Sequence, residues 1–121
     1  MSRQRRAAYR RGHWAEWLAG AYLLTKGYRL LARRYRTPLG EIDLVMRRGR
    51  TIVFVEVKAR TTLGDAFDAV GAAAERRMLA GADMWLARHP QAAGFDLRFD
   101  LVLIVPWSLP YHVENTVQAR W

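Results

Sequence analysis

Residues 41–58 read EIDLVMRRGRTIVFVEVK, and the prediction of the fold begins from this segment. Two short segments, 41–47 and 51–58, are rich in β-branched and large apolar residues, which predicts two strands. Arg48 and Gly49 lie between them, and a glycine can take the positive φ that a two-residue hairpin loop needs. The stretch therefore predicts a β-hairpin.

The register of this hairpin decides which side chains share a face. With the two-residue loop, Asp43 is predicted opposite Phe54, and Glu41 opposite Glu56. The charged residues on one face are then Glu41, Asp43, Glu56 and Lys58. Asp43 and Glu56 become diagonal neighbours, roughly 7–8 Å apart at the backbone. A three-residue loop would instead put them on opposite faces, because the side-chain period of a strand is two.

Grouped carboxylates on a partly apolar face repel one another and are poorly solvated. A divalent cation removes that penalty, and Mg²⁺ (or Mn²⁺) prefers hard oxygen ligands and keeps several waters. The predicted ligands are the carboxylates of Asp43 and Glu56 and the backbone carbonyl of Val57. Lys58 would point into the same site, where its ammonium can orient an attacking water or stabilise charge on a phosphate. From spacing alone, a solvated strand face with a cross-strand charge pair is the preferred interpretation.

Helix and strand patterns flank the hairpin. Residues 13–26 and 65–89 carry apolar side chains at three- and four-residue spacing, which predicts helices. Residues 28–36 are typical of a first strand, the apolar run 97–105 of a strand covered on both faces, and 112–117 of a weaker last strand. The order of helix, three strands, helix and strand predicts an α/β fold with a small mixed central sheet flanked by helices. The order of the strands within the sheet does not follow from the sequence.

The composition favours one domain with an anionic partner. The chain has 121 residues, with 20 Lys and Arg against 11 Asp and Glu and a net charge of +9. This excess points to a polyanion, although a soluble protein from an arginine-rich proteome would show it as well. Residues 1–11 are rich in arginine and are predicted to form a mobile basic arm.

Cysteine usage and hydropathy exclude several classes of protein. The chain has no cysteine, which excludes disulfides, thiolate catalysis and zinc–thiolate sites. No apolar run approaches the roughly 20 residues that span a bilayer, and no secretory signal pattern stands at the N-terminus. We therefore expect a cytoplasmic protein without a membrane partner.

Two motifs carry a resemblance to a known family. GEIDLV at residues 40–45 and VFVEVKAR at residues 53–60 closely resemble the PD-(D/E)xK nuclease superfamily, and in particular the YraN family of bacterial endonuclease-like proteins. The resemblance covers nearly the whole chain, because it includes a helix with an embedded Glu16, a following Gly27-Tyr28, and FDLV at residues 99–102.

The resemblance implies a restriction-endonuclease-like fold. It also implies that Asp43 and Glu56 bind metal and that Lys58 assists. Glu16 is similar to the helix glutamate that some superfamily members add to the site. Ile42 precedes the metal aspartate here, so the Pro-Asp dipeptide that names the superfamily is absent, as in many members.

Three arginines are candidates for phosphate contacts: Arg60, Arg76 and Arg77. A solvated basic helix face is an equal alternative for the last two. For Glu41, an exposed charge at a strand end is preferred over a supporting role in the site.

The remaining polar and aromatic residues have structural interpretations. Asp100 interrupts an apolar strand, and the preferred explanation is a buried ion pair with an arginine such as Arg98 or Arg60. The tryptophans are expected in the core, with Trp107 and Trp121 as the best candidates for stacking on bases. The three histidines show no ligand spacing.

The expected activity is metal-dependent hydrolysis of DNA phosphodiester bonds. Recognition would rest on backbone charge and DNA shape, with a branch or flap as a suitable substrate and a homodimer as a suitable form. One alternative is a nucleic-acid-binding module that keeps the nuclease fold without its chemistry. Another is a basic protein docked on ribosomal RNA or on anionic lipid, although the few mixed charges of the first helix speak against the lipid version.

Overall fold

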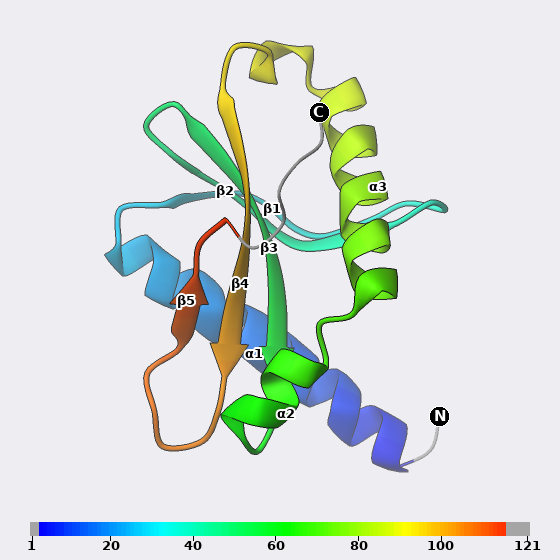
Figure 1. Cartoon of the computed structure of the whole chain (residues 1–121), viewed down its shortest axis with the longest axis vertical. Helices are drawn as coiled ribbons and strands as arrows, with labels where there is room; N and C mark the ends of the chain where they lie inside the picture. The colour runs from blue at the N-terminus through cyan, green and yellow to red at the C-terminus, as the bar shows by residue number, and fades with distance from the viewer. Residues whose placement is uncertain (1–2, 116–121) are drawn as a thin grey trace.

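The chain folds as an α/β domain in which two helices lie on a five-stranded mixed sheet, as the sequence predicts (Figure 1). This computed structural model describes residues 3–115, with the backbone alone for residues 3–12. The elements are α1 (Arg3–Thr25), β1 (Arg29–Arg36), β2 (Glu41–Arg48), β3 (Thr51–Ala59), α2 (Leu63–Asp68), α3 (Ala72–Arg88), a 3-10 turn η1 (Pro90–Ala92), β4 (Asp96–Ile104) and β5 (Tyr111–Val113).

The strands lie in the sheet in the order of the chain, β1-β2-β3-β4-β5. The pairs β1–β2, β2–β3 and β4–β5 are antiparallel, whereas β3 and β4 are parallel. A parallel pair needs a long crossover connection, and α2 and α3 supply it.

The register of the β2–β3 hairpin differs from the prediction by two residues. Gly49 and Arg50 form the loop, because Arg48 pairs with Thr51. Gly49 takes a φ of 61° at the first loop position, where a type II′ turn calls for glycine, whereas the prediction put it second. Phe54 pairs with Val45 rather than with Asp43, and the ladder ends at Leu44 and Val55. A shift of two keeps the predicted faces of the residues within the ladder. The alternation breaks at Asp43, because Ile42 and Leu44 on either side of it pack in cores on opposite faces of the sheet.

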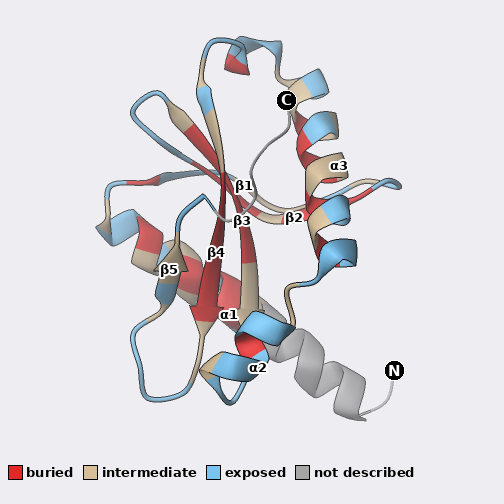
Figure 2. Cartoon of the chain, in the orientation of Figure 1, coloured by how far each residue is buried: buried red, intermediate tan, exposed pale blue. Residues whose placement is uncertain are grey.

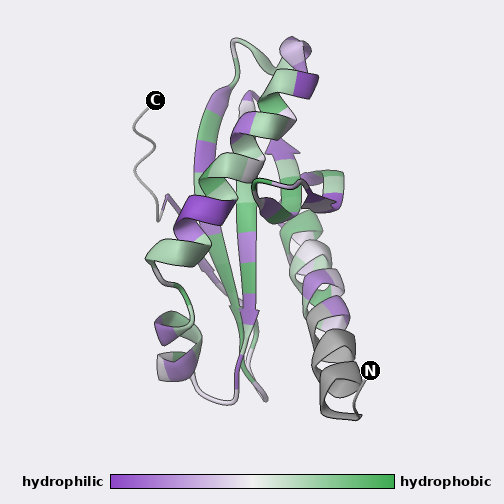
Figure 3. Ribbon diagram, turned by 90° about the vertical axis from the view of Figure 1, so that its right-hand side faces the viewer, coloured by the Kyte–Doolittle hydropathy of each residue, from purple (hydrophilic) through white to green (hydrophobic). Residues whose placement is uncertain are grey.

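The two faces of the sheet carry separate cores. On one face, Ala19 and Leu23 of α1 pack on a cluster made of Leu44, Met46, Val53, Val55 and Val102. On the other face, Met78, Ala82 and Trp85 of α3 pack on a cluster that includes Ile42, Val45, Phe54 and Phe99. The strands are consequently buried along their middle (Figure 2) and apolar between the two helices (Figure 3). Burial on both faces explains why β3 and β4 read as continuous apolar runs.

Glycines bring α3 against the turn that precedes β2. A Cβ on Gly40 would lie 2.0 Å from the carbonyl oxygen of Arg77 and 2.8 Å from the backbone nitrogen of Gly81. A side chain at position 40 would therefore push the helix off the sheet.

The boundaries of the helices and of the last strand also differ from the prediction. α1 begins at Arg3 rather than at His13, so most of residues 1–11, predicted as an arm, continue the helix. The helix predicted over residues 65–89 is two helices, because residues 69–71 are not helical and Gly71 is the N-cap of α3. The last strand is shorter than residues 112–117, and positions 116–117 lie outside the described residues. Within the described chain, no helix combines the length and apolar character that a bilayer crossing needs.

Candidate active site

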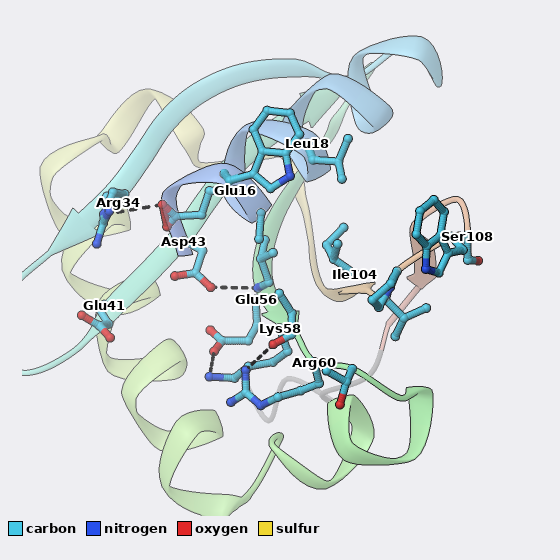
Figure 4. Close-up of a pocket in the computed structure, with 18 of the residues that line it drawn as sticks. Glu16, Leu18, Arg34, Glu41, Asp43, Glu56, Lys58, Arg60, Ile104 and Ser108 are labelled. Atoms are coloured by element: carbon cyan, nitrogen blue, oxygen red, sulfur yellow. Dashed lines mark hydrogen bonds and ion pairs between the residues drawn. The ribbon is translucent and has the colours of Figure 1, made fainter. Parts of the chain in front are cut away.

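A pocket of about 920 Å³ lies where α1 passes the N-terminal end of β2 and the C-terminal ends of β3 and β4 (Figure 4). The charged residues that line it are Glu16, Arg34, Arg36, Glu41, Asp43, Glu56, Lys58 and Arg60. The pocket thus brings together Asp43, Glu56 and Lys58 from the predicted hairpin and Glu16 from the predicted helix.

Asp43 holds the strands together where their regular pairing stops. The β2–β3 ladder ends with Leu44 opposite Val55. One step further, the backbone N–H of Val57 donates to Oδ2 of Asp43 at 2.8 Å. A side-chain carboxylate has replaced the ladder bond, which fixes the position of Asp43 beside β3. Val57 itself lines the pocket, and the role of its carbonyl as a metal ligand stays a prediction.

Glu56 and Lys58 form an ion pair inside the pocket. The distance from Nζ of Lys58 to Oε1 of Glu56 is 2.9 Å, and both side chains are largely buried. They lie two residues apart on β3, so the alternation of the strand puts both on one face. The pair sets one ammonium beside the two strand carboxylates.

Glu16 reaches the pocket from α1 and is buried there. Its Oε1 lies 3.6 Å from an Arg33 nitrogen and 3.5 Å from Nε of Arg34, and it has no hydrogen-bond partner among the described residues. Burial raises the pKa of Glu16, although Arg34 and Arg33 oppose the rise. Figure 4 shows its carboxylate beside that of Asp43, in a row that continues to Glu56.

Arg34 interrupts the β1–β2 ladder at this point. Arg33 pairs with Leu44 and Tyr35 with Ile42, while Arg34 between them takes a left-handed φ of 53°. Such a conformation costs a non-glycine residue roughly 1–3 kcal/mol and is found most often at functional sites. Here it accompanies the ion pair of Arg34 with Glu16. Nothing in the sequence pattern of β1 indicates this residue.

The surroundings of Asp43 disfavour its charged form. Burial, and after it the nearby Glu56 and Glu16 carboxylates, raise the pKa of Asp43 to about 7, against the N–H of Val57 and the ammonium of Lys58. A divalent cation would reverse this balance, and an all-oxygen donor set suits Mg²⁺. Among the described residues, no three His, Asp or Glu side chains are yet close enough together to hold a metal. The carboxylate oxygens of Asp43 and Glu56 are thus of the kind that Mg²⁺ binds. In the structure, Asp43 is bonded to Val57 and Glu56 is paired with Lys58.

The other predicted site residues are divided between the pocket and the surface. Arg60 is exposed and lines the pocket, where its guanidinium donates to the carbonyl oxygen of Ala59 at 2.7 Å. Arg76 and Arg77 are exposed on α3 and do not line the pocket. Glu41 is exposed at the rim, 3.7 Å from Nε of Arg36, as preferred for a strand-end charge.

Most of the tryptophans that were predicted to lie in the core are exposed. Trp85 is buried in the core, but Trp14 and Trp17 of α1 are 67% and 55% exposed, so the core prediction is wrong for these two. Their helix presents both to solvent because the small Ala15 and Ala19 face the sheet instead. Trp107 is fully exposed, and Trp121 lies outside the described residues.

Asp100 forms the buried ion pair that the sequence suggests, with Arg98 as its partner. Two Arg98 nitrogens donate to its carboxylate at 2.9 and 2.8 Å. Nε2 of His112 lies 2.7 Å from Oδ2 of Asp100, and Nζ of Lys26 lies 2.6 Å from Nδ1 of the same ring. Because an ammonium can only donate, Nδ1 accepts and the ring proton sits on Nε2, facing Asp100. This network is structural and explains His112 without a metal.

Comparisons with known proteins agree with the motifs. Residues 15–104 match the model of the uncharacterised protein family UPF0102. The UPF0102 protein of Mesorhizobium japonicum is 55% identical over 98% of this chain and 95% of its own length. The relative from a Chelativorans species is 57% identical over 99% of this chain and 95% of its own, and that from Agrobacterium fabrum 55% over 92% and 91%. The chain therefore belongs to the UPF0102 family, which is the YraN family that its motifs indicate.

Proposed function

We propose that this protein is a divalent-metal-dependent nuclease that acts on phosphodiester bonds of DNA with a preference for structured or branched substrates. One observation carries the proposal: Asp43, Glu56 and Lys58 converge in one pocket, with Glu16 added from a different element. Acidic residues and a lysine gathered on a strand that ends in a pocket are the parts that metal-assisted phosphodiester hydrolysis needs.

The residues take separate roles in this proposal. Asp43 and Glu56 would hold the metal, and Glu16 would add negative charge from α1. When bound, Mg²⁺ would supply an activated water and neutralise the charge that develops on the phosphate. Lys58, whose Nζ lies 2.9 Å from Glu56, would orient the water or donate to a phosphate oxygen.

Substrate binding would depend on phosphates. The net charge is +9, and Arg60 is exposed at the pocket. Affinity should therefore fall with salt, by about 0.9 log units per log unit of salt for each phosphate neutralised. A domain of this size reads backbone charge and shape more readily than base edges.

A second candidate is a nucleic-acid-binding module without turnover. It is favoured because both strand carboxylates already have partners within the protein: Asp43 accepts from the N–H of Val57, and Glu56 pairs with Lys58. In that case, Lys58 has a packing role and its aliphatic stem is what matters.

The test compares the only two lysines of the chain, Lys58 and Lys26. Lys58→Met should fold and bind DNA almost as well as the wild type, but its magnesium-dependent cleavage should fall by about a hundredfold or more. Lys26→Met is the matched control, because Lys26 contacts His112 and not the pocket. Substrates are branched, flapped, nicked, single-stranded and duplex DNAs. Equal cleavage by the two variants rejects the mechanism, and no cleavage of any substrate by the wild type supports the binding module.

A further inference from the structure

The most exposed aromatic side chain of the described residues stands at the candidate active site. Trp107 is fully exposed in the loop between β4 and β5, and it takes a left-handed φ of 65°. An indole left in water loses the gain of burial, and the backbone conformation adds a cost for a bulky residue. A fully exposed tryptophan on a strained backbone is typical of a residue that meets a ligand.

Trp14 of α1 faces the same space from another element. It is 67% exposed, and both Trp14 and Trp107 line the pocket that holds Asp43 and Glu56. Figure 4 labels three further residues around this space: Leu18 on α1, Ile104 at the end of β4 and Ser108 in the β4–β5 loop. Two separate elements thus each bring one exposed indole to this pocket.

Trp17 shows that this is not a general property of α1. It lies three residues after Trp14, yet it does not line the pocket. The guanidinium of Arg33 lies over its ring, 4.5 Å from the centroid, so one face of the Trp17 ring already contacts a side chain of the protein. Trp17 is therefore a matched control for Trp14 on the same helix.

The chemistry around the indoles identifies the ligand. Lys58 and Arg60 in the same pocket suit phosphates, and exposed indoles suit flat aromatic rings. Nucleic acid offers both, but the bases of an intact duplex are stacked on one another and present no free face. We propose that Trp14 and Trp107 form a stacking site for unpaired nucleotides beside the carboxylates, so that the substrate class is single-stranded or flapped nucleic acid. This inference rests on the proposed function for the placement of the scissile phosphate.

Loss of either indole should weaken the binding of an oligonucleotide, whether or not the protein cleaves it. Stacking on one aromatic ring contributes about 1–3 kcal/mol per base, which is roughly a 5- to 150-fold change in Kd. Trp14→Ala and Trp107→Ala should each weaken binding of a single-stranded oligonucleotide by a factor in this range. Trp17→Ala should leave it unchanged, and Trp107→Phe should keep most of the affinity because a ring remains.

The experiment measures binding by fluorescence anisotropy in EDTA, where metal-dependent cleavage cannot interfere. The probes are a 12-nucleotide single-stranded DNA, its RNA counterpart, a blunt duplex, and an abasic strand with the same number of phosphates. The single strands should bind more tightly than the abasic strand, and only the former should respond to Trp14→Ala and Trp107→Ala. Comparison of the DNA and RNA arms identifies the nucleic acid.

A second readout keeps the outcome independent of folding. In protein labelled with 5-fluorotryptophan, the fluorine resonances of Trp14 and Trp107 should shift on addition of the single strand, while those of Trp17 and Trp85 should not. Equal affinity for normal and abasic strands, or unmoved Trp14 and Trp107 resonances, overturns the stacking site. Loss of a self-association by Trp107→Ala without any effect on oligonucleotide binding would do so too, since the loop would then be a protein contact. Shifts without cleavage would support the stacking site and reject the nuclease proposal alone.

Discussion

Two carboxylates on one sheet, Asp100 and Asp43, show opposite solutions to the burial of a charge. Asp100 is fully buried on β4 and accepts hydrogen bonds from Arg98, His112 and the backbone N–H of Asn115. Burial alone would raise its pKa, but these hydrogen bonds lower it below the ordinary value. The charge is satisfied within the protein, and the site has no capacity left for a ligand.

Asp43 is less deeply buried, yet its charge is less well supported. It accepts from the N–H of Val57, while burial, and after it the nearby Glu56 and Glu16 carboxylates, raise its pKa. The number of donors, and not the exposure to solvent, separates a carboxylate whose charge is fully satisfied from one whose charge is poorly supported. Proteins accept such a deficit mostly at functional sites.

The largest expected difference between the two is in stability. Asp100→Asn leaves Arg98 and His112 without their charged partner and should lower the free energy of unfolding by about 3 kcal/mol or more. Asp43→Asn removes a carboxylate repelled by its neighbours and should leave stability in EDTA unchanged or slightly higher. Urea unfolding followed by circular dichroism measures both. Equal losses in the two variants would remove the distinction between the sites.

The next difference is the response to metal. Mg²⁺ at about a hundred times its Kd should raise the free energy of unfolding of the wild type by about 2.7 kcal/mol, because only the folded state has the site. Asp43→Asn should abolish this gain. Glu41→Gln, which changes an exposed carboxylate at the rim of the same pocket, should keep it. A gain that survives Asp43→Asn would place the cation elsewhere.

The smallest difference is in the effect of pH without metal. The pKa of Asp43 is about 7 in the folded protein against an ordinary value of 3.8, so the folded state holds a proton that the unfolded state releases. This contribution to stability is complete below the unfolded value and is lost as pH rises through about 7. In EDTA, the wild type should therefore lose about 2.5 kcal/mol more than Asp43→Asn between about pH 5 and pH 8. Parallel dependences of the unfolding free energy on pH in the two proteins would show that the pKa of Asp43 is not raised in the folded state.

The sequence predicted those features that depend on side-chain alternation. Glu56 and Lys58 were expected on one face of their strand, and they form an ion pair there. Asp43 was expected beside them and lines the same pocket, although the register was wrong by two and the alternation of β2 breaks at Asp43. Strands β2, β3 and β4 were found because burial on both faces requires continuous apolar runs. The family followed from the motifs around the same residues.

Features that depend on contacts between distant elements were not predictable. The left-handed backbone of Arg34 and its pairing with Glu16 join β1 to α1 and leave no local pattern. The exposure of Trp14 follows from which face of α1 meets the sheet, and an indole fits either side of an amphipathic helix. The order of the strands likewise follows from the crossover through α3, which the sequence of each strand does not encode.

We propose that Asp43 and Glu56 together hold a divalent cation, and a manganese titration followed by electron paramagnetic resonance is the sharpest test of this site. Free Mn²⁺ gives a sharp spectrum that broadens on binding, so the bound fraction can be read without any substrate or turnover. We predict a site in the wild type and in Glu41→Gln that is lost in both Asp43→Asn and Glu56→Gln. Binding in these last two variants that equals the wild type would contradict the account.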